Sequence, residues 1–289
     1  MRLVLTRNNQ AAAAVCVSAL FFAGTSALIK HLGTQVSLEL IVFARNFFSL
    51  LLLLPWVAYT GVRNLISDQP GLHMLRGMFG LGAMYASFYA LTQLPLAQAT
   101  LLTQTAPLYV PLIAAWWLRE SLDRTLLLAA LVGFAGVGLI LSPADTGLDN
   151  RAALWGLASG LFAGCAFVTL RRMSRSEPPL RTVFYFTVVG TLVSAFPLAL
   201  NWVPPPSQAW LPLISLAVLA TGGQAFLTLG YGLAPAARVG PFNYMNVVFA
   251  ALLGIVFWGE VPSSLALAGA VLVFIAAAVV LRHGPGLKR

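Results

Sequence analysis

Ten apolar stretches of about 20 residues each follow one another along this 289-residue chain, with only short connections between them. A bilayer core about 30 Å thick needs roughly 20 apolar residues per helix at a rise of 1.5 Å per residue. The composition agrees, because 59% of the residues are hydrophobic and only 9% are charged. We therefore predict an all-α integral membrane protein with ten transmembrane helices, at residues 11–29, 38–59, 71–91, 96–117, 124–142, 152–170, 181–200, 209–230, 238–258 and 264–282.

The basic residues predict the orientation, because cytoplasmic loops are enriched in Lys and Arg. With the N-terminus inside, thirteen Lys and Arg residues fall on the cytoplasmic side, and only Lys30 and Arg151 fall on the outer side. Arg2 and Arg7 before an apolar run would also suit a cleaved signal peptide. Because that run extends to Ile29 and nine further spans follow, a retained first helix is the better interpretation. We expect an inner-membrane protein of bacterial type with both termini in the cytoplasm.

The chain resembles itself when it is shifted by 140 residues. At that offset Pro95 aligns with Pro235, and Glu120 aligns with Glu260. Chance similarity between apolar segments is the alternative, but a true repeat would divide the chain into five-helix units at 1–145 and 146–289. Because five is odd, the second unit must cross the membrane in the opposite sense. Such inverted repeats are typical of secondary transporters, whose substrate site lies near the midplane where the halves meet.

Each half carries a set of recognisable motifs. They are Tyr89 to Leu102, Ala106 to Pro111, Glu120 and Gly133 to Gly138 in the first half, and Tyr231 to Ala236, Phe249 to Gly254, Gly259-Glu260 and Ala268 to Ala270 in the second. These motifs resemble the EamA-type module of the drug/metabolite transporter superfamily. The resemblance covers nearly the whole chain and implies ten spans, a central cavity and alternating access. It does not identify the transported solute, since members of the family move amino acids, other metabolites or drugs.

Polar side chains within spans are the informative ones, because in hydrocarbon each must find a partner or line a wet cavity. Amides, hydroxyls and aromatic rings recur at similar depths on the third, fourth, eighth and ninth spans. They could instead make ordinary interhelical hydrogen bonds, worth about 0.6 kcal/mol each. As a group we predict that they line the pocket. The candidate substrate-binding residues are Tyr85, Tyr89, Thr103, Gln104, Gln224, Thr228, Asn243, Tyr244 and Asn246.

Two prolines and two arginines within the spans need separate treatment. Pro107 and Pro111 each remove a backbone hydrogen bond, so the fourth span contains either a hinge or a static kink. The aligned positions of the ninth span, Val247 and Ala251, are not proline. Arg45 and Arg76 either extend to their nearest membrane interfaces or act as anion anchors, since Arg binds carboxylates in bidentate fashion.

Acidic residues are absent from the centres of the predicted spans, where a proton or sodium relay would need one. We therefore expect uncoupled facilitated transport or exchange. Glu120 and Glu260 end the fourth and ninth spans, where they cap a connection, pair with a cation or form a gate. The three histidines lie near span ends, so we expect them to be solvated or interfacial, and we expect no metal and no cofactor. Cys16 and Cys165 could form at most one disulfide.

These features predict a secondary transporter that moves small organic metabolites of the amino-acid-like class by alternating access. The expected partners are a small-molecule substrate and the lipid bilayer, without nucleic acid, and the expected assembly is a monomer or weak homodimer. Two other functions stay open: efflux of drugs or lipophilic cations, and a membrane scaffold or sensor that transports nothing. We expect no enzyme activity, because the chain matches no metalloprotease motif, P-loop or nucleophile elbow.

Overall fold

The computed structural model describes residues 2–61, 65–118, 124–140, 150–173, 177–233 and 240–283. Within these ranges every regular element is a helix. Five helices there are long and apolar enough to cross a membrane, and three more apolar helices are shorter. Together with α3 and the α4–α5 pair they account for the ten predicted spans, so the all-α membrane fold is confirmed.

The helices follow the predicted spans closely. The described elements are α1 (Arg2–Leu32), α2 (Leu38–Thr60), α3 (Pro70–Gln93), α4 (Leu96–Thr103), α5 (Ala106–Leu118), α6 (Arg124–Ile140), α7 (Asn150–Met173), α8 (Pro179–Leu200), η2 (Ser207–Ala209), α9 (Trp210–Leu233), η3 (Gly240–Tyr244), α11 (Met245–Trp258) and α12 (Ser264–His283). Local signals set several boundaries. The Ser37 hydroxyl accepts from the Leu40 N–H at the start of α2, and Gly259 ends α11 in the left-handed conformation that glycine adopts without strain.

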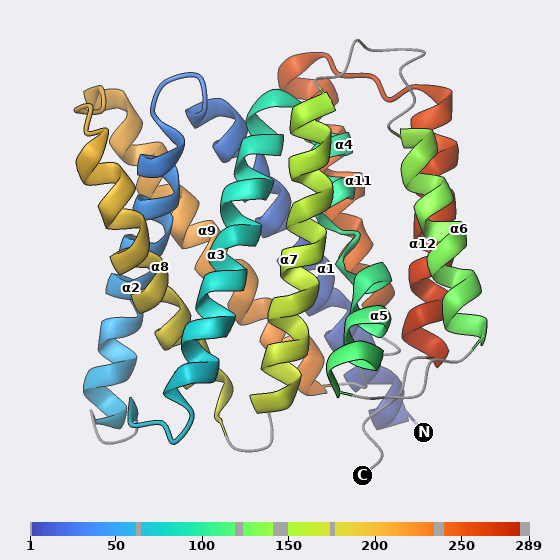
Figure 1. The fold of residues 1–289 in the computed structure, drawn as a ribbon, viewed down its shortest axis with the longest axis horizontal. Helices are drawn as coiled ribbons and strands as arrows, with labels where there is room; N and C mark the ends of the chain where they lie inside the picture. Colours follow the sequence, from blue (N-terminus) through green and yellow to red (C-terminus); the bar gives the residue numbers. More distant parts are fainter. Residues whose placement is uncertain are drawn as a thin grey trace.

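The two halves run in opposite directions. In Figure 1, α1 starts at the end of the bundle where α12 finishes, here called the termini end, whereas α7 starts at the opposite end. Packing follows the same symmetry. The contact between α1 and α9 has its counterpart in the contact between α7 and α3, whereas the α2–α8 and α6–α12 contacts each join a helix to its equivalent in the other half. Five helices and their inverted copy therefore form one bundle. The predicted repeat boundary at 145/146 and Glu120 lie outside the described residues.

The fourth and ninth spans are both interrupted, at equivalent places in the repeat. The fourth span breaks at Gln104 and Thr105 between α4 and α5, and the ninth changes from η3 to α11 after Tyr244. Gln104 and Tyr244 are related by the 140-residue offset. Within the predicted fourth span, helix α4 therefore ends at Thr103 and α5 begins at Ala106, one residue before Pro107.

The cause of the break differs from a simple proline kink. Pro107 is the second residue of α5, where a missing N–H costs little. The Thr103 and Thr105 hydroxyls donate to the carbonyls of Thr100 and Leu102 at 2.8 and 2.6 Å, which satisfies acceptors at the end of α4. The second copy breaks without prolines at the aligned positions, so the interruption belongs to the repeat. The side chains of Pro107 and Pro111 lie outside the described residues, and their hinge role stays a prediction.

Small residues on α7 let it approach this break closely. A β-carbon added at Gly160 would lie 2.1 Å from the Thr105 hydroxyl oxygen, and one added at Gly156 would lie 2.9 Å from Leu102. Such contacts are too short for any side chain, so α7 must carry glycine here. The glycine spacing on this helix therefore serves packing within the chain.

Candidate functional site

A small polar cavity lies among α2, α3, α8 and α9, and both intramembrane arginines line it. The cavity measures about 50 Å³. Arg45 comes from α2 and Arg76 from α3, and their guanidinium carbons lie 5.5 and 4.2 Å from the centre of the Phe186 ring on α8. We call this space the arginine cavity. Its further lining residues are Ser49, Leu53, Val183, Thr187, Ala220, Thr221 and Gln224.

The α2 side of the cavity is held by a buried amide. Arg45 Nη1 donates to Asn46 Oδ1 at 3.2 Å, and Asn46 Nδ2 donates to the carbonyl of Val42 at 2.8 Å. Asn46 is fully buried against Gly190 of α8, where an added β-carbon would lie 2.5 Å from its Oδ1 atom. The close approach of α8 to α2 thus fixes the residue that orients Arg45. Across the cavity, Thr221 of α9 donates to Ser49 of α2 at 3.1 Å.

A second polar region surrounds the two helix breaks, where α4 packs on α11. Several buried atoms here have no hydrogen-bond partner among the described residues, namely Gln98 Oε1, Thr100 Oγ1 and Asn246 Oδ1. The same holds for the hydroxyl of Tyr85 on α3. Because unsatisfied buried polar atoms are costly, they mark places that water or a solute could occupy.

The predicted substrate-binding residues divide between these two regions. Gln224 lines the arginine cavity. Tyr85 and Tyr89 lie on α3, Thr103 and Gln104 end α4, and Asn243, Tyr244 and Asn246 lie where η3 meets α11. The side chain of Thr228 lies outside the described residues. The sequence placed the binding walls on the third, fourth, eighth and ninth spans, whereas the arginine cavity also uses the second and seventh, α2 and α8.

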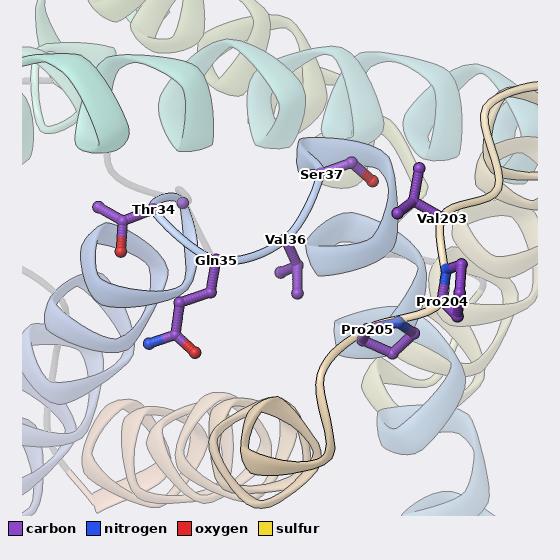
Figure 2. Close-up of a pocket in the computed structure, with 8 residues that line it drawn as sticks. Thr34, Gln35, Val36, Ser37, Val203, Pro204 and Pro205 are labelled. Carbon is purple, nitrogen blue, oxygen red and sulfur yellow. The ribbon is translucent and has the colours of Figure 1, made fainter.

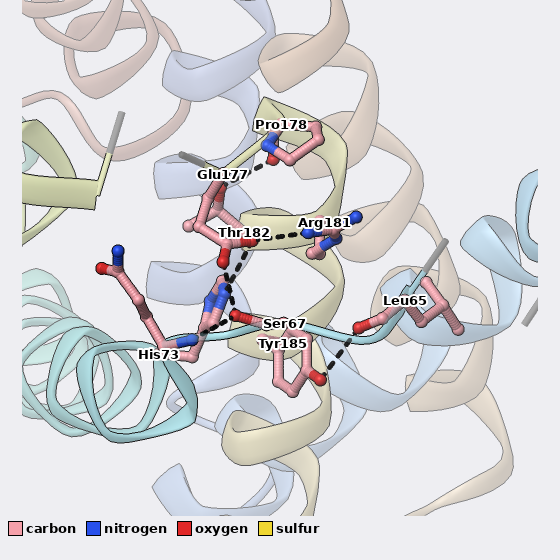
Figure 3. Close-up of polar contacts among 9 residues, drawn as sticks. Leu65, Ser67, His73, Glu177, Pro178, Arg181, Thr182 and Tyr185 are labelled. Atoms are coloured by element: carbon pink, nitrogen blue, oxygen red, sulfur yellow. Dashed lines mark hydrogen bonds and ion pairs between the residues drawn. The ribbon is translucent and has the colours of Figure 1, made fainter. Parts of the chain in front are cut away.

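At the termini end, a carboxylate joins the α2–α3 connection to the start of α8. Glu177 Oε1 accepts a hydrogen bond from Ser67 at 2.5 Å, and its Oε2 accepts one from Arg181 at 3.0 Å. His73 Nε2 lies 3.3 Å from the same Oε2, and its ring stacks on Tyr185 with centroids 4.2 Å apart. Figure 3 shows these contacts. We call Ser67, His73, Glu177, Arg181 and Tyr185 the Glu177 cluster.

Glu177 and His73 are buried, and the Glu177 cluster holds its carboxylate in the charged form. Burial alone would raise the pKa of Glu177, but the hydrogen bonds from Ser67 and Arg181 and the adjacent His73 imidazole outweigh it and lower the pKa below its ordinary value. His73 is only 1% exposed. It lies near a span end as expected, but the expectation that it is solvated or interfacial is wrong, because it packs between Glu177 and Tyr185.

The opposite end of the bundle has the equivalent connections, and there they enclose a hollow. A pocket of about 270 Å³ separates the α1–α2 connection, residues 33–37, from residues 203–205 after α8. Figure 2 shows Gln35 and Val36 facing this space from one side, and Pro204 and Pro205 from the other. Among the described residues, no hydrogen bond or ion pair joins the two segments. We call this space the outer pocket.

An ion pair fastens a different part of the opposite end. Lys30 at the end of α1 pairs with Glu260 after α11, and its ammonium also donates to the Leu94 carbonyl at 2.7 Å. The other Glu260 oxygen accepts from the Leu96 N–H at 2.6 Å, at the start of α4. Glu260 therefore both pairs with a cation and caps a helix, joining the two repeats.

The comparisons with known proteins agree with this architecture. The sequence profile of the EamA-like transporter family matches residues 9–142 and 150–282, one match in each half. The chain belongs to the EamA-like transporter family. It is therefore a membrane transporter for small molecules and is not an enzyme.

Individual relatives of this transporter have different substrates. It is 33% identical over 267 residues to the pseudopaline exporter CntI of Pseudomonas aeruginosa, covering 92% of this chain and 93% of that protein. It is 29% identical over 252 residues to the S-adenosylmethionine uptake transporter of Rickettsia felis, covering 84% and 83%. One crystal structure shares the fold with a TM-score of 0.65 at 24% identity, covering 94% of this chain and 96% of the other. These relatives establish transport and leave the substrate open.

Sequence reasoning missed the Glu177 cluster and Phe186. One signal was available, because Glu177 and Arg181 are four residues apart at the start of a helix and such pairs meet on one face. Their contact with Ser67, from 110 residues earlier, carries no comparable signal.

Proposed function

We propose that this transporter carries small amino-acid-like solutes across the bacterial inner membrane, by facilitated transport or exchange, with both termini in the cytoplasm. The repeat boundary near residue 145 separates the two units that would move relative to each other. Alternating access requires the two ends of the bundle to open in turn. The observation that carries the proposal is the unequal closure of equivalent connections, joined at the termini end by Glu177 and separated by the outer pocket at the opposite end.

The polar groups inside the bundle support a solute with both polar and apolar parts. Buried amide and hydroxyl atoms lie near the helix breaks, α3 carries the aromatic residues Tyr85 and Tyr89, and the arginine cavity lies about halfway along α2. A lipophilic cation would meet two guanidinium groups in that cavity, and like charges repel strongly in a medium of low dielectric constant. This repulsion disfavours cation efflux.

Counterflow in liposomes tests the proposal. A panel of labelled amino acids and metabolites would be offered to vesicles preloaded with the same unlabelled solutes, and at least one amino-acid-like solute should accumulate transiently. Failure of every solute would contradict the proposed cargo. Uphill uptake driven by a proton or sodium gradient would contradict uncoupled transport.

The helix-break residues provide the matched test of the site. We expect Asn243→Ala and Gln104→Leu to reduce counterflow without loss of folded yield, because they remove polar groups near the breaks. Ala163→Ser on α7 would serve as a polar control. Unchanged flux in both variants would remove these two residues from the site.

A further inference from the structure

The two arginines of the arginine cavity both extend to the Phe186 ring and away from their nearest membrane interfaces. Arg76 is in the second turn of α3, near the termini end, yet its Nη1 atom lies beside Gly80, one turn deeper in the membrane. A β-carbon at Gly80 would lie 2.9 Å from that Nη1 and 2.7 Å from Phe186. Arg45 approaches the same Phe186 ring from α2, which starts at the opposite end. This geometry contradicts the alternative that both arginines extend to their own interfaces.

Arg76 has donors that the protein leaves unused. Its Nε and Nη1 atoms are buried and have no hydrogen-bond partner among the described residues. Arg45 makes one hydrogen bond, to the neutral Asn46 amide. In the described part of the chain, neither guanidinium forms an ion pair with a carboxylate. Two like charges in a low-dielectric interior are unfavourable unless an anion compensates them.

The lining of the cavity indicates which anion would fit. Its volume of about 50 Å³ leaves room for a small anionic group. A planar carboxylate matches the planar fork of Arg in a bidentate pair. The Ser49 hydroxyl lines the same cavity, and because it accepts its hydrogen bond from Thr221, its own hydrogen could be donated to a carboxylate oxygen.

We propose that the arginine cavity binds the carboxylate of the transported solute, with Arg76 and Arg45 as its two cationic contacts and Phe186 as the ring that positions both. The proposal rests on the proposed transport function and adds the chemical class of its cargo. The rest of the solute must lie outside the cavity, which holds only the anionic group.

Binding can be tested apart from transport. Protein purified in detergent would be heated with sodium propionate or with propionamide, which has nearly the same shape but no charge. We expect propionate to raise the melting temperature of the wild type and of the control Arg172→Gln, an exposed arginine on α7, and to have no effect on Arg76→Gln. Equal effects of propionate and propionamide on the wild type would overturn the proposal.

Counterflow then tests the same site during transport. Labelled amino acids would be compared with their carboxamides, and we expect Arg76→Gln and Arg45→Gln to lower flux of the acids at least tenfold. Arg172→Gln should behave as wild type. Acid flux that survives in both cavity variants overturns the carboxylate proposal and leaves the proposed transport function standing. If the wild type transports no amino acid, the proposed function is refuted. Propionate binding then tests by itself whether the arginine cavity binds a carboxylate.

Two glycine variants of α3 test the same site without removing either arginine, in case the arginine variants fold poorly. Gly80→Ala would displace Arg76 or Phe186, whereas the β-carbon of Gly82→Ala would meet Phe162 at an ordinary 3.5 Å. We expect loss of propionate stabilisation in the first and its retention in the second. The opposite order would refute the proposal.

A lipid headgroup is the other source of an anion, and the vesicle composition separates it from the solute. Dependence of flux on Arg76 should be the same in phosphatidylcholine vesicles and in vesicles that also contain phosphatidylglycerol. Dependence confined to the anionic vesicles would assign the cavity to a lipid and overturn the proposal.

Discussion

The two ends of the bundle use equivalent connections differently. At the termini end, the α2–α3 connection and the start of α8 share the Glu177 carboxylate. At the opposite end, the α8–α9 and α1–α2 connections enclose about 270 Å³. In the first spans the repeat aligns at an offset of 141 residues, which pairs Ser18 with Ser159 and Lys30 with Arg171. At that offset Glu177 aligns with Val36, which has no acceptor in its side chain. One carboxylate thus distinguishes connections that are joined by hydrogen bonds from equivalent connections that border a pocket.

Removal of the Glu177 charge should have the largest effect on this difference. Glu177→Gln leaves Arg181 and His73 without their anion, and loss of charged hydrogen bonds worth about 1.5–3 kcal/mol each should open the termini end. The assay uses Thr187→Cys in a variant that lacks Cys16 and Cys165, with an impermeant maleimide added from the termini end. We expect this cysteine to react about tenfold faster when Glu177→Gln is present than when Glu177 is intact, which corresponds to about 1.4 kcal/mol.

Asp68→Asn is the matched control for this experiment. Asp68 is exposed and adjoins Ser67 in the same connection, but it lies outside the Glu177 cluster. Its neutralisation should leave the labelling rate at the wild-type value. Equal rates in Glu177→Gln and wild type would show that the Glu177 cluster does not close this end.

Acidification should weaken the closure of the termini end more gradually than Glu177→Gln does. The pKa of Glu177 lies below its ordinary value of 4.5 in the closed structure, so the charged cluster contributes its full stability above that value. The contribution is lost as the pH falls below 4.5 and through the lowered pKa. Labelling of the Thr187 cysteine should therefore be constant from neutral pH to about 5 and rise below 4.5. Persistence of that rise in Glu177→Gln would assign it to another group.

Filling the outer pocket should have a smaller effect. Val36→Trp places a large ring between the connections of the opposite end, which would hinder entry of a solute without breaking a polar contact. We expect counterflow to fall about threefold, which is under 1 kcal/mol in the barrier, with little change in melting temperature. The control Val261→Trp changes an exposed residue outside the pocket and should leave counterflow intact. Equal flux in the two variants would argue against entry through the outer pocket.

The smallest effect is expected between the two ends, where Thr221 bonds to Ser49. Thr221→Ala removes an interhelical hydrogen bond worth about 0.6 kcal/mol and should lower the melting temperature by roughly 1–2 °C. Thr191→Ala removes a hydroxyl that bonds only within α8, to the Thr187 carbonyl, and provides the control. A larger loss in the control would show that the α2–α9 contact does not stabilise the bundle.

The fold could be predicted because each step needed only local information. Apolar runs of span length identify the helices, and an odd number of spans per repeat requires inversion. The break in the fourth span was less accessible. Pro107 drew attention to the correct region, but the matching interruption after Tyr244 has no proline at the aligned positions Val247 and Ala251, and it lies where α11 packs on α4.

The sequence by itself determined the membrane class, the positions of the spans and the presence of polar groups within them, since hydrophobicity and helix rise act along the chain. Only the tertiary structure decided that Arg45 and Arg76 meet at Phe186, and that Glu177 closes one end by binding Ser67. Long side chains can turn either way along a helix, and the packing of α8 against α2 and α3 selects the direction. Contacts between distant segments follow from that packing and leave no periodic signal in the sequence.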